Sequence, residues 1–539
     1  MIRLRNAEVG AICRRDILRS IGVGCSLVAG KRAEGSEIHA ESAAVETQSG
    51  RVRGFSDRGI DTYLGIPYGA STAGAARFQR AQAPKPWTQT RLALQYGPSC
   101  PQMESRWHDL TAYFYDYNVA RMDEDCLRLN VWTPGSKPTG KRPVMLWLHE
   151  RGFYGGFGHE LKAIHGRNLA ERGDVVVVSI NHRVNIFGFF NLSNYGAQYA
   201  DSTNVGLLDC VLALEWVKQN IANFGGDPSN VTIFGQSGGG AKVNHLMAMP
   251  SAKGLFHKAI AQSPVPLITQ VRSLEETATY ANEVVGRLGL NKFNIAKIHE
   301  LPHQAIQGAY LETLRAKSNG WNGPAADGGA LPESPFARTA PELSAEIPLM
   351  VGTTIRESGP ILDPAVGVMS EDELGRRVRN KFGERRDEVL RAMRKAYPTM
   401  KAFDLWHQID KPEFREAAVL QAARKWEQQG APVYLYQFAW ESRVLDGAPR
   451  AFHGSEVAFV FHNTDLCERM TGGTLEAREL AGKVCDAWVA FARTGNPNHK
   501  NLPHWPAFAP IRESTMIFDN VCEVKNAYDR EAREALRPR

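Results

Sequence analysis

The sequence predicts an α/β protein built around a large, mostly parallel central sheet with helices on both faces. Val144–Leu148, Val175–Ile180 and Val231–Phe234 are continuous apolar runs, a pattern typical of strands covered on both sides. Between the last two runs, Asp209–Ile221 carries apolar residues at helical spacing. Strand, helix and strand in this order favour parallel pairing, because a helix must carry the chain back across the sheet.

The elements before and after this region complete the prediction. Gly50–Gly69 alternates apolar and polar residues with glycine punctuation, which predicts antiparallel strands at the entry to the sheet. After the parallel region, charged amphipathic stretches alternate with apolar strands. The stretches are 273–290 and 371–396, and the strands are 348–352 and 433–438. Since no repeat or linker separates these parts, we expect one large domain with helical insertions.

Composition excludes several classes of protein. Of 539 residues, 43% are hydrophobic and 23% are charged, which argues against a disordered, collagen-like or coiled-coil chain. The 64 basic and 58 acidic residues give a net charge of +6, and the basic ones are scattered. Nucleic acid is therefore an unfavourable partner. No apolar run reaches the roughly 18 residues that a membrane span requires.

Residues 1–43 differ from the rest of the chain. Cys13–Arg19 reads CRRDILR, which resembles a twin-arginine export signal, and a short apolar run rich in small residues follows at Ile21–Gly30. This pattern predicts an exported protein, periplasmic or secreted, whose residues 44–539 form the single domain. The alternative is an amphipathic N-terminus without a targeting role.

The number and spacing of the cysteines predict neither a disulfide-rich scaffold nor a metal site. Eight cysteines are too few for a disulfide-rich scaffold, and no C-x-x-C pair offers a zinc site. Removal of the leader leaves Cys100, Cys126, Cys210, Cys467, Cys485 and Cys522. We expect no metal and no organic cofactor.

A G-x-S-x-G motif, Gly235–Gly239, lies between the strand at Val231–Phe234 and a predicted helix that starts near Gly240. A serine at a tight strand-to-helix turn is held exposed, and small neighbours allow the turn and the approach of a substrate. Ser237 is therefore the candidate nucleophile; the alternative is an ordinary glycine turn. A serine needs a base, and the base an acid, which in such folds follow in the order serine, acid, histidine. Spacing alone does not select the base among His245, His257, His303, His407, His453, His462, His499 and His504.

Longer segments of the chain carry a family resemblance. They are YLGIPYG (63–69), EDCLRLNVWTP (124–134), NHRV (181–184), GLLDCVLALEWVKQNIANFGGDPSNVTIFGQSGG (206–239) and FARTGNPN (491–498). From about Gly50 to Phe518 the chain resembles the type-B carboxylesterases, the cholinesterase-like branch of the α/β-hydrolases. The resemblance implies an α/β-hydrolase fold with helical insertions over the active site.

The same resemblance assigns the acid and the base. The family's acid ends a G-x-x-x-x-E segment, which here is Gly352–Glu357, and its histidine opens an H-G-x-E segment, which here begins at His453. Glu357 and His453 are thus the implied partners of Ser237. Asp327 is the competing acid, although its segment matches a turn that is not catalytic in the family.

The implied oxyanion hole consists of the backbone NH groups of Arg151, Gly152 and Gly238. Relatives commonly read H-G-G-G-F where this chain reads HERGF (149–153). A positive φ at Glu150 or Arg151 would cost roughly 1 kcal/mol or more in a residue with a side chain. The Arg151 guanidinium either recognises esters that carry an anionic group or turns away and pairs with an acid such as Glu150 or Glu160.

The family also joins two cysteines at the lip of its active site, and Cys100 and Cys126 match them. The alternative is a pair of buried free thiols. The aromatic residues between them line an acyl or alcohol pocket or belong to the core: Trp107, Tyr113, Phe114, Tyr115 and Tyr117.

The resemblance therefore implies a serine carboxylesterase that cleaves small-molecule esters through a Ser-His-Glu triad and an acyl-enzyme. Two alternatives stay open: a weakly active or inactive hydrolase-like binding protein, and a hydrolase of carbamates, lactones or activated amides. Gln236 stands where cholinesterases have glutamate, which argues against choline esters. The natural ester and the oligomeric state are left open.

Overall fold

The computed structural model describes residues 40–103, 110–135, 141–264, 271–316, 323–358 and 368–538. The folded unit runs from Ala40 to Arg539, and the predicted export signal lies outside the described residues. The first strand begins at Ala40, earlier than the expected domain start at residue 44, because Ala40 already pairs with Ser56 of the neighbouring strand.

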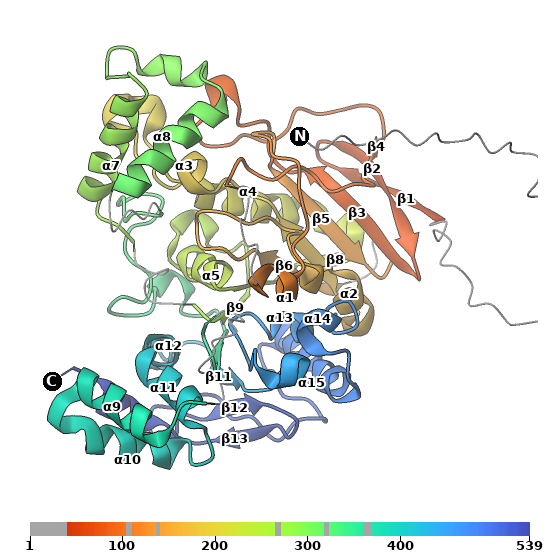
Figure 1. Cartoon of the computed structure of the whole chain (residues 1–539). Coiled ribbons are helices and arrows are strands. Elements are labelled where there is room, and N and C mark those ends of the chain that lie inside the picture. The colour runs from red at the N-terminus through yellow and green to blue at the C-terminus, as the bar shows by residue number, and fades with distance from the viewer. Residues whose placement is uncertain are drawn as a thin grey trace, which may run out of the picture. The chain divides into compact units, whose positions relative to one another are not determined.

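A single large mixed sheet forms the centre of the unit (Figure 1). Its order is β1-β2-β3-β5-β7-β6-β8-β9-β10-β11-β12-β13, with β4 paired to β2. All pairs from β7 to β12 are parallel and the entry strands β1, β2, β3 and β5 pair antiparallel, as the sequence predicts, whereas β4 pairs parallel to β2 and β13 antiparallel to β12. The strands are β1 (Ala40–Thr47), β2 (Gly50–Asp57), β3 (Ile60–Pro67), β4 (Arg91–Leu92), β5 (Arg128–Thr133), β6 (Arg142–Leu148), β7 (Val176–Ile180), β8 (Gly226–Gln236), β9 (Lys258–Gln262), β10 (Leu349–Thr354), β11 (Val433–Phe438), β12 (Thr515–Phe518) and β13 (Glu523–Lys525).

The two faces of the sheet have separate hydrophobic cores. On β6, Val144, Leu146 and Leu148 pack in one core, whereas Met145 and Trp147 pack in the other. The first core includes α4 (Val205–Asn220), α5 (Gly238–Ala248) and α12 (Glu413–Glu427), and the second includes α2 (Arg167–Gly173), α13 (Val457–Val460) and α15 (Leu475–Thr494). A strand buried on both sides needs apolar residues at every position, which explains the continuous runs in the sequence.

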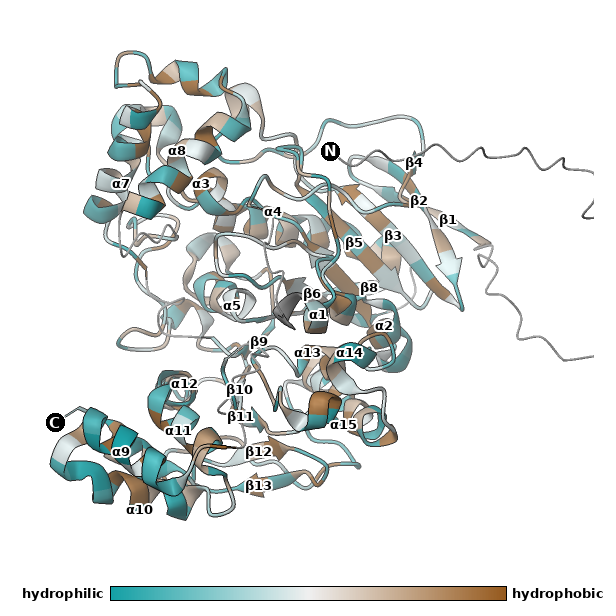
Figure 2. Ribbon diagram, viewed as in Figure 1, coloured by the Kyte–Doolittle hydropathy of each residue, from teal (hydrophilic) through white to brown (hydrophobic). Residues whose placement is uncertain are grey.

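The remaining helices lie in the insertions and at the ends of loops. They are α1 (Leu110–Tyr115), α3 (Asn185–Gly188), α7 (Leu274–Arg287), α8 (His303–Ala316), α9 (Glu371–Phe382), α10 (Arg386–Ala396), α11 (Ala402–Asp410), α14 (Glu468–Thr471) and α16 (Arg530–Leu536). The predicted stretch 371–396 is divided into α9 and α10 at Gly383, whose φ of +60° ends the first helix. Both helices carry hydrophilic and hydrophobic residues side by side (Figure 2). Among the described residues, no helix is long and apolar enough to cross a membrane.

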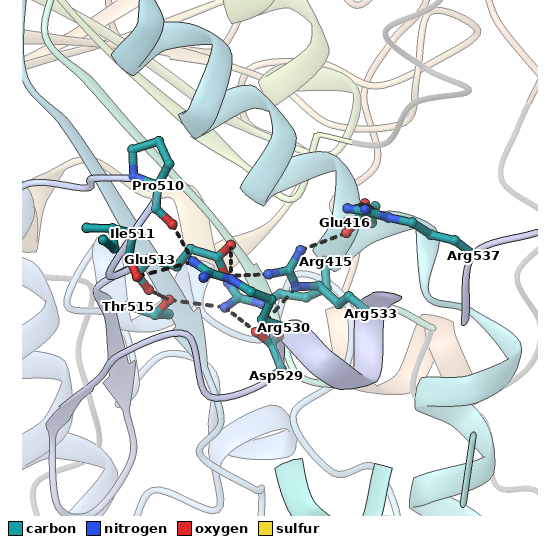
Figure 3. A network of polar contacts seen from close by, with 10 residues as sticks. All are labelled: Arg415, Glu416, Pro510, Ile511, Glu513, Thr515, Asp529, Arg530, Arg533 and Arg537. Carbon is teal, nitrogen blue, oxygen red and sulfur yellow. Dashed lines mark hydrogen bonds and ion pairs between the residues drawn. The ribbon is translucent and has the colours of Figure 1, made fainter. Parts of the chain in front are cut away.

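A network of buried charges joins the C-terminal helix α16 to α12 (Figure 3). Arg415 Nε lies 2.7 Å from Asp529 Oδ2, and both side chains are buried. Arg533 binds Asp529, Glu416 and Glu513, so the carboxylates are shared among several guanidinium groups. Since α12 packs on β10 and β11, this network connects the chain end to the central sheet.

Asp529→Asn should lower the free energy of unfolding by about 3 kcal/mol, because it leaves the buried guanidinium of Arg415 without its counter-charge. The measurement is denaturant unfolding followed by circular dichroism. Glu531→Gln is the control, since Glu531 pairs with Lys395 in an exposed ion pair that contributes about 0–1 kcal/mol. Equal effects of the two changes would contradict a stabilising role for the network.

Candidate active site

Ser237 lies at the turn from β8 into α5, where the sequence predicts the nucleophile. Its φ of 55° and ψ of −118° are unusual for a residue with a side chain. The turn is held by two backbone hydrogen bonds: Ser237 N donates to Gln262 O at 2.8 Å, and Ala241 N donates to Ser237 O at 3.0 Å. A strained, half-buried serine at the end of a buried strand has the geometry of a nucleophile elbow.

The glycines after Ser237 allow a second loop to approach the turn. A Cβ on Gly239 would lie 2.0 Å from Leu148 O, and one on Gly238 would lie 2.3 Å from Gly152 N. Neither distance leaves room for a side chain. The loop at 149–153 and the serine turn are therefore in backbone contact, and both positions require glycine.

Glu357 and His453 are brought together by the ends of different elements. Glu357, buried just beyond β10, accepts hydrogen bonds from Thr354 N at 2.8 Å and Ser263 Oγ at 2.7 Å through Oε1. Its other oxygen, Oε2, accepts a hydrogen bond from His453 Nδ1. Burial alone would lower the pKa of His453, but the charge of Glu357 and this hydrogen bond outweigh burial, and the pKa is raised.

Asp327, the competing acid, is engaged elsewhere. It accepts hydrogen bonds from Asn204 Nδ2 and from the backbone NH groups of Gly329 and Leu331, each at 2.8–2.9 Å. These contacts fix a turn. Within the part of the chain that is described, no contact joins Asp327 to His453.

The other nitrogen of His453 contacts Gln236 rather than Ser237. Gln236 Nε2 lies 3.2 Å from His453 Nε2, and since Nδ1–H is directed at Glu357, the amide is the donor. No hydrogen bond joins Ser237 Oγ to His453 within the described residues. Contacts of this kind often form only with substrate bound.

Two aromatic residues fix His453 from its sides. Tyr115 Oη donates a hydrogen bond to the backbone carbonyl of His453, and the Phe414 ring lies 5.6 Å from the imidazole. Phe414 directly precedes Arg415 in the chain. The network of charged residues that joins α12 to α16 therefore also helps to hold Phe414 beside His453.

The loop that replaces H-G-G-G-F has left-handed backbone at two positions. Arg151 has a φ of 62° and Gly152 one of 59°. A positive φ is unfavourable for a residue with a side chain. The conformation of Arg151 therefore costs roughly 1 kcal/mol, as expected from the sequence if φ is positive there. Its guanidinium donates to Glu160 Oε1 at 2.7 Å, with 14% and 4% of the two side chains exposed. Pairing with an acid is thus the alternative that the structure adopts.

Three further polar residues support the site and were not predicted: Ser263, Lys242 and Glu456. Ser263 binds Glu357, and Lys242 binds the loop at 149–153. Glu456 accepts from Gln262 Nε2 at 3.2 Å; burial and then the charge of Glu357 raise its pKa to about 7. Lys242 could have been found from the sequence as the charged residue in a helix of mostly apolar and small residues directly after the serine motif. Among the described residues, no cluster of His, Cys, Asp and Glu is suited to hold a metal ion.

Cys100 and Cys126, the predicted disulfide pair, are buried free thiols in this structure. The neighbouring Cys100 thiol, together with burial, raises the pKa of the Cys126 thiol, so the two are adjacent. The disulfide stays a prediction. The cysteines whose pairing was open are also free: Cys210, Cys467, Cys485 and Cys522.

The aromatic residues between Cys100 and Cys126 divide into core and surface. Phe114 and Tyr115 are buried and pack on Phe452, whereas 48% of Tyr113 is exposed. Tyr117 stacks on Tyr115, and Trp107 lies outside the described residues. At least two members of the set therefore support the His453 segment from the core.

Comparison with known proteins decides the family. The model of the carboxylesterase family matches residues 41–535. The chain belongs to the carboxylesterase family. It is 35% identical to para-nitrobenzyl esterase of Bacillus subtilis, across 92% of this chain and 98% of that protein. It is 32% identical to phenmedipham hydrolase of Pseudarthrobacter oxydans, across 91% and 97%.

Solved structures agree with this carboxylesterase assignment. An esterase from Clostridium hathewayi, described as able to hydrolyse aliphatic aromatic polyesters, superposes with a TM-score of 0.84 at 35% identity, covering 92% of this chain and 97% of that one. The chain therefore has the α/β-hydrolase fold and is a carboxylic ester hydrolase.

Gly238→Ala should reduce kcat/KM for a p-nitrophenyl ester by about 100-fold or more, because the new methyl group would displace the loop that approaches the serine turn. Steady-state kinetics at several ester concentrations measure this change. Gly308→Ala is the control, since a Cβ there meets nothing within 4 Å inside helix α8. Wild-type kinetics for Gly238→Ala would show that the contact is not required.

Proposed function

We propose that the protein is a serine carboxylesterase that forms an acyl-enzyme on Ser237. His453 takes the serine proton as Ser237 attacks the ester carbonyl, and then gives a proton to the leaving alcohol. Water activated by His453 releases the acid in a second step. Glu357 orients the imidazole and stabilises its charged form.

The observation that carries this proposal is the fixed orientation of Glu357. One carboxylate oxygen is held by Thr354 N and Ser263 Oγ, which directs the other at His453 Nδ1. With Nδ1 protonated, Nε2 is the acceptor that a general base requires. Ser237 lies on the strained turn directly before helix α5. For proton transfer, His453 Nε2 must give up its hydrogen bond from the Gln236 amide and accept one from the Ser237 hydroxyl instead.

The oxyanion in this mechanism is bound by the NH groups of Arg151, Gly152 and Gly238. The close approach of Gly238 to the Gly152 backbone supports this assignment, because it brings together the two segments that carry the proposed donors. Arg151 takes part through its backbone alone, since its side chain is paired with Glu160.

Ser237→Ala should lower turnover of a p-nitrophenyl ester by about 10³-fold or more while leaving the unfolding transition in place. Intact-protein mass spectrometry should detect the acyl group on wild type and not on the variant. Ser251→Ala, another serine with a buried hydroxyl, should keep full activity. Activity in Ser237→Ala would overturn the mechanism. A substrate panel with an ester, a carbamate, a lactone and an activated amide shows which of these bonds the protein cleaves.

Glu357→Gln should lower the pKa of His453, because it removes the charge that raises it. The base must be neutral, so kcat/KM falls as the pH drops through this pKa. The acid limb of the pH profile of kcat/KM should therefore move to lower pH, with a loss of about 10³-fold or more at the plateau. An acid limb that stays in place would assign that ionisation to another group.

We also propose that the protein is exported through its twin-arginine signal and that residues 44–539, together with the start of β1 at Ala40, act as one domain. Mature protein from an export-competent host should begin downstream of Gly30 and contain a Cys100–Cys126 disulfide. Loop closure suggests a stabilisation on the order of 3 kcal/mol. N-terminal sequencing and thiol alkylation measure both features. An intact Met1 with both thiols alkylated would contradict export and disulfide together.

A further inference from the structure

Lys242 is a buried charge that the proposed triad does not use. It lies in α5, directly after the serine turn, and all eleven residues of this helix are buried, Lys242 completely. Burial lowers the pKa of Lys242 to about 7, against the opposing effects of Cys210, Glu160 and Glu150. An ammonium group in such a place destabilises the fold unless its hydrogen bonds compensate for the lost hydration.

Those hydrogen bonds are made to the loop beside Ser237. Lys242 Nζ donates to His149 O at 2.9 Å and to Gly152 O at 2.7 Å, and lies 5.4 Å from the centre of the Phe153 ring. Both acceptors are backbone carbonyls. The ammonium thus connects the helix that carries the nucleophile to the loop with the proposed oxyanion donors.

The two carbonyls flank the donor peptides. The NH groups of Arg151 and Gly152 belong to the peptide units 150–151 and 151–152. The carbonyl of His149 belongs to the unit before them, and that of Gly152 to the unit after. Because peptide units are planar, fixing the outer two carbonyls restricts the rotation of the two units between them.

This restriction acts on backbone that is not intrinsically favoured. Arg151 and Gly152 both have positive φ, and relaxation of Arg151 toward negative φ would rotate its NH away from its present direction. The cation also keeps both carbonyl oxygens directed at α5. A carbonyl turned toward the reacting ester would repel the negative charge that develops there.

We propose that Lys242 is a positioning residue of the oxyanion hole, whose ammonium group holds the HERGF loop in the conformation that presents its NH groups. This inference rests on the proposed acyl-enzyme mechanism. It predicts that loss of the ammonium reduces stabilisation of the tetrahedral intermediate more than binding of the ester.

The test compares Lys242→Met with Lys425→Met. Lys425 is the matched control within the same chain, because it is equally buried and lies outside the proposed site. Its ammonium donates to the carbonyls of Ser344 and Ala345, each at 2.7 Å. We expect Lys242→Met to lower kcat about 100-fold with KM nearly unchanged. An aryl trifluoromethyl ketone, which binds as a tetrahedral oxyanion, should lose affinity by a similar factor. Lys425→Met should lower the melting temperature and leave both quantities unchanged.

Several outcomes would overturn the inference. One is wild-type kcat in folded Lys242→Met; another is an equal loss of affinity for the trifluoromethyl ketone and for the unreactive matching alcohol. If Lys242→Met does not fold, Lys242→Gln retains an amide donor and is measured in the same way. Failure of the proposed function is distinguishable, because it would appear as activity in Ser237→Ala. Failure of this inference alone leaves Ser237→Ala inactive and Lys242 variants with normal kcat.

Discussion

The constraint on which the site depends is the pairing of β6 with β8. Leu148 at the end of β6 lies opposite Gly235 of β8, so the loop after one strand and the serine turn after the other leave the sheet side by side. Their backbones then come so close that Gly238 and Gly239 have no room for a Cβ. The glycines of the motif are consequences of this pairing, and so is the position of Lys242, whose helix starts at the turn.

Around this contact the chain buries several titratable side chains. Glu150, Glu160 and Lys242 are buried and Arg151 is largely buried, although charged groups are expensive to remove from water. Arg151 and Glu160 compensate each other as an ion pair, and Lys242 is compensated by carbonyl oxygens. Glu150 has an unpaired Oε1, and burial raises the pKa of its carboxyl well above the usual range. The two side chains that replace glycine in this loop therefore do not behave alike.

The strands could be predicted because their cause is local. A strand covered on both faces needs apolar residues throughout, so 433–438 reads as a strand from sequence alone and is β11 in the structure. Ser237 is also recognisable, since its strand and helix context is local. The contacts of Ser263, Gln236 and Lys242 join segments that only the fold brings together, and no periodicity encodes them. Glu357 and His453 were selected by family resemblance rather than by spacing, for the same reason.

Arg151 and Gln236 differ in charge from the residues that the family resemblance leads us to expect, and the structure limits their effect on substrate choice. An arginine beside the proposed oxyanion donors suggests recognition of anionic esters, but its guanidinium already binds Glu160, and both groups are largely buried. Breaking that pair to bind a substrate carboxylate would leave the Glu160 charge unpaired inside the protein, a cost of several kcal/mol that one new ion pair does not exceed. Gln236 likewise offers His453 an amide instead of a carboxylate. Neither Arg151 nor Gln236 therefore presents an uncompensated charge to the ester.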